Sequence, residues 1–286
     1  MKEVKTVFVV GAGIMGHGIA QVFAEAGFIT YMRDLNEELV QKGMAKIKKN
    51  LAKKVSKGKI AEDQVQEILS RLYPVTALNK ISQADLVIEA ATENAAIKEK
   101  IFREIDEFIS EDSILASNTS SISITKLASF TEKPEKFIGM HFFNPVQTMK
   151  VVEIIPGLQT EDVILDSIKE VVGKVGKEVV VAKDYPAFLL NRILLPMLNE
   201  AYYCYMEGKG SAEDIDKGMK LAMGHPMGPL ELSDFIGLDT LLSVFNVMYE
   251  GYGDQKYFPC PILNKLVEAG HYGVKSGKGF YDYTNK

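Results

Sequence analysis

Short runs of β-branched and other apolar residues alternate with longer amphipathic segments over the first two thirds of the chain. The runs have the length of buried strands, and the segments carry apolar residues at the spacing of a helix. Strands that alternate with helices are typical of βαβ units, whose sheet is mostly parallel. The predicted strands are residues 4–10, 28–32, 84–89, 114–116, 137–143, 149–155 and 177–182, and the predicted helices are 14–26, 37–56 and a segment carrying Ile97, Ile101, Ile105 and Phe108.

From Ala187 onward no strand-like run occurs, and longer helical segments follow, separated by glycines. They predict helices over residues 188–207, 212–223, 230–249 and 261–269. A chain of 286 residues is also long for one domain. We therefore predict two domains, an α/β domain over residues 1–184 and an all-helical domain over residues 185–286.

The composition excludes several classes of protein. The formal net charge is −5, whereas general affinity for nucleic acid needs a positive surface. Cys204 and Cys260 lie far apart and in no metal-ligand spacing, which favours a chain without disulfides or a metal site in a reducing cytoplasm. No apolar run has the length of a membrane span, and the run near the N-terminus ends in glycine, as a strand before a turn does.

A glycine-rich motif follows the first predicted strand and begins the first predicted helix. Its residues are Gly11, Ala12, Gly13, Ile14, Met15 and Gly16. Such glycines allow a tight turn, a close approach of the backbone to a pyrophosphate and close packing of helix on sheet, while the helix N-terminus attracts phosphate. Asp34 follows the second strand, where a carboxylate accepts hydrogen bonds from the ribose of NAD and repels the 2′-phosphate of NADP. Arg33 beside it leaves NADP open, and the alternative is a turn without a ligand.

The predicted helix 37–56 is strongly basic. Eight lysines and no acidic residue lie between Lys42 and Lys59. The apolar residues occupy one face of the helix and most of the lysines the opposite face, an arrangement that suits an anionic ligand such as coenzyme A. From charge alone, a solvated surface helix is the more frequent explanation of such a run.

His141 and Glu153 form a candidate acid–base pair. If the strands 137–143 and 149–155 form a hairpin centred on Gln147, the two residues face each other, about 5 Å apart. Glu153 lies in an apolar run where an unpaired charge would be costly. Histidine suits the proton transfer that accompanies hydride transfer to or from a carbonyl. The alternative is a buried His–Glu hydrogen bond without chemistry.

Two polar segments lie where a ligand is expected. Residues 117–121 (SNTSS) follow the strand 114–116, and ligands bind beyond the carboxyl ends of parallel strands. The same segment also offers an N-cap for a helix over 124–129, although one cap needs fewer polar residues. Asn191 and Arg192 lie one helical turn into the helical domain, from where they can face the cofactor crevice expected at the carboxyl ends of the strands.

Together these segments resemble the 3-hydroxyacyl-CoA dehydrogenase family, and most closely its short bacterial members that act on 3-hydroxybutyryl-CoA. The matching blocks are residues 116–121 (ASNTSS), 141–145 (HFFNP), 191–192 (NR), 225–229 (HPMGP) and 277–281 (GKGFY). The resemblance implies a Rossmann-type doubly wound sheet with a C-terminal all-helical domain. It also implies an NAD-dependent oxidoreductase that interconverts (S)-3-hydroxyacyl-CoA and 3-oxoacyl-CoA, and a homodimer formed through the helical domain.

The resemblance further implies roles for individual residues. His141 is the general acid–base, Glu153 orients it, and Ser120 and Asn191 bind the reacting oxygen or the thioester. The implied cofactor contacts beyond the glycine motif and Asp34 are Glu93, Lys98, Asn118, Ser120, Asn144 and, more weakly, Lys275. Lys53 and Lys57 correspond to family contacts with coenzyme A, which strengthens that interpretation of the basic helix.

One position departs from the family pattern. The family usually has glycine where this chain has Ala187, and alanine restricts the backbone, so we expect a slightly altered hinge between the domains. Two other functions stay open. One is a dehydrogenase of free 3-hydroxy acids, although such enzymes usually rely on a lysine in the helical domain. The other is a non-catalytic structural protein of the same family, which the complete set of candidate catalytic residues disfavours.

Overall fold

Eight strands form one sheet in the first part of the computed structural model, which describes residues 2–284. The strands are β1 (Thr6–Val10), β2 (Ile29–Arg33), β3 (Leu72–Val75), β4 (Leu86–Glu89), β5 (Ile114–Ser117), β6 (Phe137–Phe142), β7 (Val151–Pro156) and β8 (Glu178–Val181). Their order is β3-β2-β1-β4-β5-β6-β7-β8, and every neighbouring pair is parallel except β6 and β7. The predicted doubly wound, mostly parallel sheet is confirmed.

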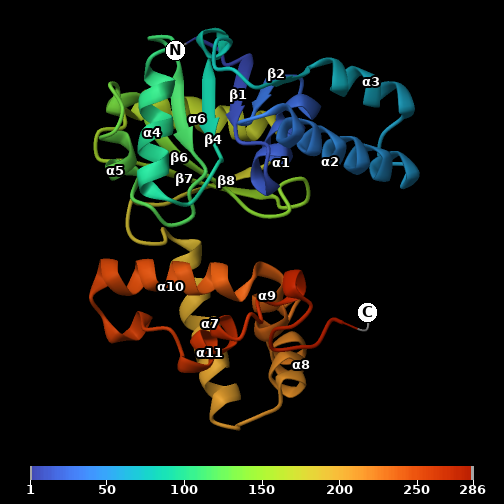
Figure 1. Cartoon of the computed structure of the whole chain (residues 1–286), viewed down its shortest axis with the longest axis vertical. Coiled ribbons are helices and arrows are strands. Elements are labelled where there is room, and N and C mark those ends of the chain that lie inside the picture. The colour runs from blue at the N-terminus through green and yellow to red at the C-terminus, as the bar shows by residue number, and fades with distance from the viewer. Residues whose placement is uncertain (1, 285–286) are drawn as a thin grey trace. The chain divides into compact units, whose positions relative to one another are not determined.

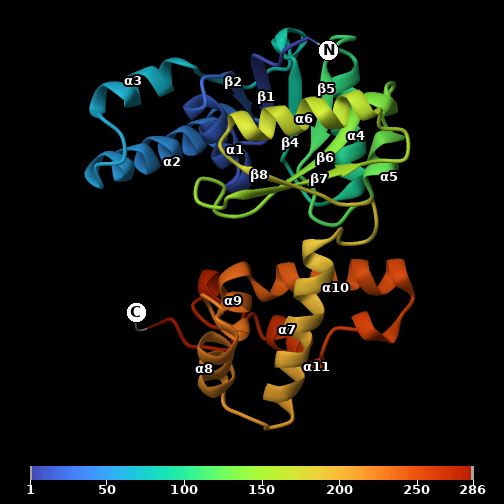
Figure 2. The ribbon, with the colours of Figure 1, turned by 180° about the vertical axis from the view of Figure 1, so that it is seen from behind.

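Helices cover both faces of this sheet, as Figures 1 and 2 show from opposite sides. They are α1 (Ile14–Glu25), α2 (Glu37–Ser56), α3 (Glu62–Ser70), α4 (Ala95–Asp106), α5 (Ile124–Ala128) and α6 (Asp162–Lys174). The helices α1, α2 and α6 share one apolar core with strand residues such as Val7, Val9 and Ile88. On the other face, Phe102 of α4 contacts Phe137 of β6 edge to face, with the ring centroids 5.2 Å apart.

Three elements of this part are absent from the sequence prediction, namely α3, β3 and α6. In α3 only Ile68 is fully buried, and β3 has four residues, including Pro74. Elements this short or this exposed carry little periodic signal, because few of their positions are required to be apolar. The helix α6 has four buried residues, among them Ile164 and Ile168, so its apolar pattern was detectable and the sequence prediction overlooked it.

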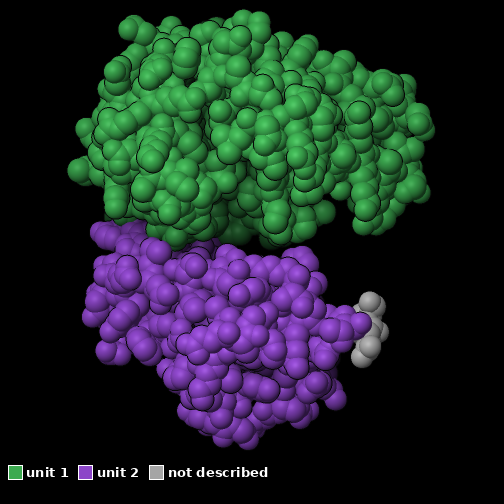
Figure 3. All heavy atoms as spheres, in the orientation of Figure 1, with its two compact units in different colours: residues 1–184 green, residues 185–286 purple. Residues whose placement is uncertain are grey.

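The chain divides into two units, residues 1–184 and 185–286, which Figure 3 colours green and purple. The second unit contains α7 (Leu190–Met206), α8 (Ala212–Met223), α9 (Pro229–Ile236), α10 (Leu238–Tyr252) and α11 (Pro261–Glu268). Its core includes Leu195, Leu198, Tyr202 and Phe245. Every helix of the described residues is too short or too polar to span a bilayer.

Two predicted boundaries in the second unit are wrong. The segment 230–249 is not one helix, because Gly237 has a φ of 108° and separates α9 from α10. The first helix begins at Leu190 rather than at residue 188, because Ala187 and Phe188 have φ values of 63° and 53°. Both lie in the left-handed region, so Ala187 takes the backbone conformation that glycine adopts most easily.

Candidate active site

The glycine turn between β1 and α1 fits a phosphate group. Gly11 has a φ of 109°, and a Cβ on it would lie 2.6 Å from the carbonyl oxygen of Ala90. A Cβ on Gly16 would lie 1.9 Å from the carbonyl oxygen of Gly11, whereas Gly13 borders open space. No side chain caps the N-terminus of α1, and its first turn has no acidic residue. The first N–H groups of α1 are therefore available to an anion, as a pyrophosphate requires.

The carboxylate of Asp34 accepts hydrogen bonds from the backbone beside this turn. Its Oδ2 accepts a hydrogen bond from the N–H of Ala12 at 2.7 Å, and its Oδ1 accepts one from Leu35 at 2.8 Å. Each carboxylate oxygen can accept a second hydrogen bond. The position therefore fits the predicted ribose contact and also gives Asp34 a part in shaping the turn.

His17 lies in the first turns of α1, behind the glycine motif. Its Nδ1 is 2.5 Å from the carbonyl oxygen of Gly13. Burial lowers the pKa of His17 below its ordinary value, and Lys46 on α2 adds to this lowering, while the hydrogen bond with Gly13 opposes it. The ring therefore lies beside the glycine turn in surroundings that disfavour its charged form.

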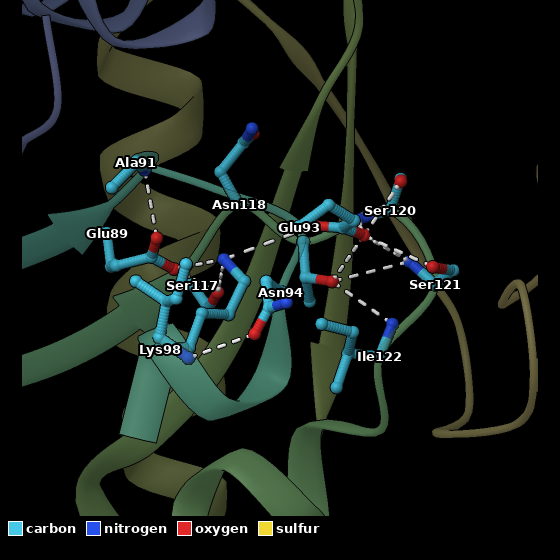
Figure 4. A network of polar contacts seen from close by, with 12 residues as sticks. Glu89, Ala91, Glu93, Asn94, Lys98, Ser117, Asn118, Ser120, Ser121 and Ile122 are labelled. Carbon is cyan, nitrogen blue, oxygen red and sulfur yellow. Dashed lines mark hydrogen bonds and ion pairs between the residues drawn. The ribbon is translucent and has the colours of Figure 1, made fainter. Parts of the chain in front are cut away.

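A carboxylate joins the loops that follow β4 and β5. The Oε1 atom of Glu93 lies between 2.7 and 3.2 Å from donor atoms of Thr119, Ser120 and Ser121. These donors are two backbone N–H groups and three hydroxyls, and Figure 4 shows Ser120 and Ser121 around Glu93. The hydroxyl of Ser120, predicted to contact substrate and cofactor, lies 2.9 Å from Glu93 and keeps acceptor capacity for a ligand.

The segment 117–121 does not provide the cap of the following helix. The N-cap of α5 is Ser123, whose side chain accepts a hydrogen bond from the N–H of Lys126. Asp184 adds to it, since its carboxylate accepts hydrogen bonds from Ser123 Oγ, at 2.9 Å, and from two backbone N–H groups at the start of α5. The polar side chains before it bond elsewhere, Ser117 to Glu89 and the hydroxyls of residues 119–121 to Glu93.

Lys98 is buried beneath Glu93. Its side chain is 1% exposed, and its Nζ forms an ion pair with Glu89 and lies 3.3 Å from Ser117 Oγ and 4.0 Å from Glu93 Oε2. The sequence predicted Lys98 and Glu93 but not Glu89 or Ser117. An acidic residue within or at the end of an apolar run is the signal that could have identified Glu89, as the position of Glu153 inside such a run identified that residue.

His141 and Glu153 face each other across β6 and β7, in the register that the sequence predicted. The Nδ1 of His141 lies 3.0 Å from Glu153 Oε2, and the side chains are 7% and 0% exposed. The ring of Phe143 packs on the imidazole, with the centroids 4.4 Å apart. Asn118 anchors the adjacent backbone, because its Oδ1 accepts a hydrogen bond from the N–H of Phe142 at 2.9 Å.

The turn between these strands, residues 143–150, is longer than a tight hairpin, yet it keeps the predicted register. The buried Nζ of Lys177 donates hydrogen bonds to the carbonyl oxygens of Val146 and Met149, both at 2.6 Å. Burial lowers the pKa of Lys177 below its ordinary value. Asn144, a predicted cofactor contact, is exposed at the start of this turn.

The basic helix α2 turns its lysines toward solvent. Lys53 and Lys57 are exposed, and neither has a carboxylate within 4.0 Å among residues 2–284. Lys42 and Lys54, in contrast, pair with Glu38 and Glu25 at 2.6 and 2.5 Å. Uncompensated positive charge on α2 is thus concentrated near its C-terminal half, which suits the predicted anionic ligand.

The remaining predicted residues lie in the second unit. Asn191 is in the first turn of α7, followed by Arg192, whose guanidinium lies over the rings of Tyr252 and Tyr257, 4.0 and 4.5 Å from their centroids. Lys275 forms an ion pair with Asp239, and the hydrogen bond from its Nζ to Asp239 Oδ2 is 2.7 Å long. The roles of Asn191 and Lys275 stay predictions.

Comparisons with known proteins match one family over nearly the whole chain. The family model for the NAD binding domain of 3-hydroxyacyl-CoA dehydrogenase matches residues 6–185, and the model for its C-terminal domain matches residues 188–283. The 3-hydroxybutyryl-CoA dehydrogenase of Bradyrhizobium diazoefficiens is 52% identical over 280 residues, which cover 98% of this chain and 96% of that protein. The human mitochondrial hydroxyacyl-coenzyme A dehydrogenase is 42% identical over 288 residues, covering 98% of this chain and 91% of that protein.

A solved structure is also similar over the full length. The crystal structure of (S)-3-hydroxybutyryl-CoA dehydrogenase from Ralstonia eutropha has a TM-score of 0.96 and 46% identity, and the match covers 99% of this chain and 100% of that one.

Proposed function

Since the chain belongs to the 3-hydroxyacyl-CoA dehydrogenase family and is an NAD-binding oxidoreductase, we propose that it interconverts (S)-3-hydroxybutyryl-CoA and acetoacetyl-CoA. The observation that carries the chemistry is the buried contact between His141 and Glu153 at the end of β6. The relatives named for 3-hydroxybutyryl-CoA support the choice of a four-carbon substrate.

His141 is the proposed acid–base group. Bound NAD supplies the hydride acceptor or donor for C3 of the acyl chain. His141 gives a proton to the oxygen on C3 during reduction and takes it back during oxidation, through Nε2, because Nδ1 contacts Glu153. Glu153 orients the ring and stabilises its protonated form, as a carboxylate beside an imidazole does. Ser120 and Asn191 are proposed to bind the reacting oxygen or the thioester.

The cofactor site is proposed to follow the carboxyl edge of the sheet. The glycine turn, with Gly11, Gly13, Ile14, Met15 and Gly16, holds the pyrophosphate, and Asp34 binds the adenine-side ribose. Glu93, Lys98, Asn118 and Asn144 surround the nicotinamide half, to which Lys275 is a further proposed contact. This arrangement favours NAD over NADP because Asp34 repels a 2′-phosphate.

Coenzyme A is proposed to lie against α2, with Lys53 and Lys57 binding its phosphates. A homodimer formed through the second unit and a cytoplasmic location also remain proposals.

The test is the absorbance of NADH during incubation of the purified protein with acetoacetyl-CoA, and separately with free acetoacetate. We expect oxidation of NADH with the thioester and at most a trace with the free acid. Faster turnover of free acetoacetate would show a free-acid dehydrogenase. NADH binding without turnover of either compound would show a non-catalytic family member. NADPH in the same assay measures the cofactor preference.

A further inference from the structure

Two opposite charges are buried where α4 meets the end of β4, at the edge of the sheet where the cofactor is proposed to bind. Glu89 is the last residue of β4 and is 0% exposed, and the ammonium of Lys98 on α4 contacts it directly. Ser117, the last residue of β5, donates a hydrogen bond to the same Glu89 oxygen, Oε2, at 2.8 Å. Figure 4 shows the three side chains gathered on one side of Glu93.

The second oxygen of Glu89 holds a stretch of backbone. Oε1 accepts a hydrogen bond from the N–H of Ala91 at 2.9 Å. The carbonyl oxygen of Ala90 is the atom that a Cβ on Gly11 would meet at 2.6 Å, and the Cα of Ala91 lies 2.9 Å from the same point. Glu89 therefore fixes both the ammonium of Lys98 and the backbone that forms a wall of the glycine turn.

A buried ion pair is a poor device for stability alone, because the cost of removing two charges from water offsets much of their attraction. Its value here is geometric. The ammonium of Lys98 is held 4.0 Å from Glu93 Oε2, and within this distance only Glu89 and Glu93 supply carboxylates to it among residues 2–284. Glu93 in turn lies at the exposed rim, with a side chain that is 41% exposed.

We propose that Glu89 is a positioning residue for the dinucleotide, which sets the place of Lys98 and, through it, of Glu93 at the nicotinamide end of the site. This inference rests on the proposed cofactor roles of Glu93 and Lys98. Glu89 does not touch the cofactor. It acts from beneath, as the supporting shell of a binding site does.

The test measures the Kd of NADH by fluorescence titration, which does not depend on the acyl substrate. Glu89→Gln keeps an oxygen that can accept the hydrogen bond from Ala91 but removes the charge that holds Lys98. We expect it to raise the Kd about tenfold or more, the size of effect that loss of a charged hydrogen bond produces. Glu89→Asp keeps the buried charge and serves as the second variant should Glu89→Gln fail to fold. Its shorter side chain moves the carboxylate away from Lys98, so it should also weaken NADH binding.

Lys98→Met separates positioning from folding. In the Lys98→Met background, Glu89→Gln should change the Kd less than about twofold, because the group it positions is already absent. Ser113→Ala is the matched control, since Ser113 precedes β5, is buried, and bonds to the carbonyl oxygen of Ala84. It should destabilise the fold and leave the Kd unchanged.

The proposal is overturned if Glu89→Gln and Glu89→Asp leave the Kd within twofold of the unmodified protein, or if Glu89→Gln weakens NADH binding equally with and without Lys98. Absence of turnover with acetoacetyl-CoA in the unmodified protein would instead contradict the proposed function, and the NADH titration would still report on Glu89.

Discussion

Replacement of Glu153 by glutamine tests what the carboxylate contributes to catalysis. Glutamine has nearly the same size and can still place an oxygen near His141 Nδ1, where Glu153 Oε2 now lies at 3.0 Å. What disappears is the negative charge beside a ring that is proposed to become protonated. A hydrogen bond to a charged group contributes about 1.5–3 kcal/mol, and each 1.4 kcal/mol is a factor of ten, so kcat should fall about 10- to 150-fold.

The assay is steady-state oxidation of NADH at saturating acetoacetyl-CoA. The Kd of NADH should stay within twofold, because Glu153 is buried in β7, away from the glycine turn after β1. Thermal unfolding checks that the variant is folded. A kcat within twofold of the unmodified enzyme would refute the reasoning, because the carboxylate would then be a structural partner of the ring with no effect on its proton transfer.

Three further predictions concern the basic helix, the glycine turn and the start of the second unit. Replacing Lys53 and Lys57 by glutamate should raise the KM for acetoacetyl-CoA at least about fivefold at low salt and by less at high salt, while kcat stays nearly unchanged. The control variant Lys42→Glu should have the KM of the unmodified protein. The pKa of His17 is lowered in the folded protein, so as the pH drops through 6.5 the unfolded chain takes up a proton on this ring first and the unfolding free energy falls. In His17→Gln this fall should be smaller, and an unchanged dependence of the unfolding free energy on pH would contradict the prediction. Ala187→Val should lower the unfolding free energy by more than about 2 kcal/mol, because Ala187 is fully buried at a φ of 63°. Ala187→Gly should leave the unfolding free energy nearly unchanged, because relief of backbone strain offsets the loss of the buried methyl group. Denaturant unfolding that shows the valine variant to be as stable as the unmodified protein would contradict this.

The sequence was sufficient for the parts of the site that local pattern determines. The glycine motif between a strand and a helix has fixed spacing, so the position of Gly11, Gly13 and Gly16 followed directly. The facing of His141 and Glu153 followed from the two-residue period of strands and the symmetry of a hairpin. The turn itself is not tight, and its shape depends on Lys177, a residue distant in sequence whose amine binds two of its carbonyls.

Contacts between segments that are distant in the chain could not be predicted from the sequence. Lys98 was predicted from resemblance, but its pairing with Glu89 depends on the packing of α4 against β4, which the sequence pattern does not give. The break at Gly237 was missed for a similar reason, since one glycine in an apolar helical pattern is often tolerated. Here the tertiary structure uses it, because the N–H of Leu238 bonds to the carbonyl oxygen of Tyr272 rather than continuing the helix.

The most direct test of the central claim is the turnover of the His141→Gln variant with NADH and acetoacetyl-CoA, measured beside its Kd for NADH. Removal of a positioned acid–base group should lower kcat by about 10²–10⁴-fold, while NADH binding stays within twofold because the glycine turn and Glu93 are untouched. Near-normal turnover by a folded variant would contradict the assignment of proton transfer to His141.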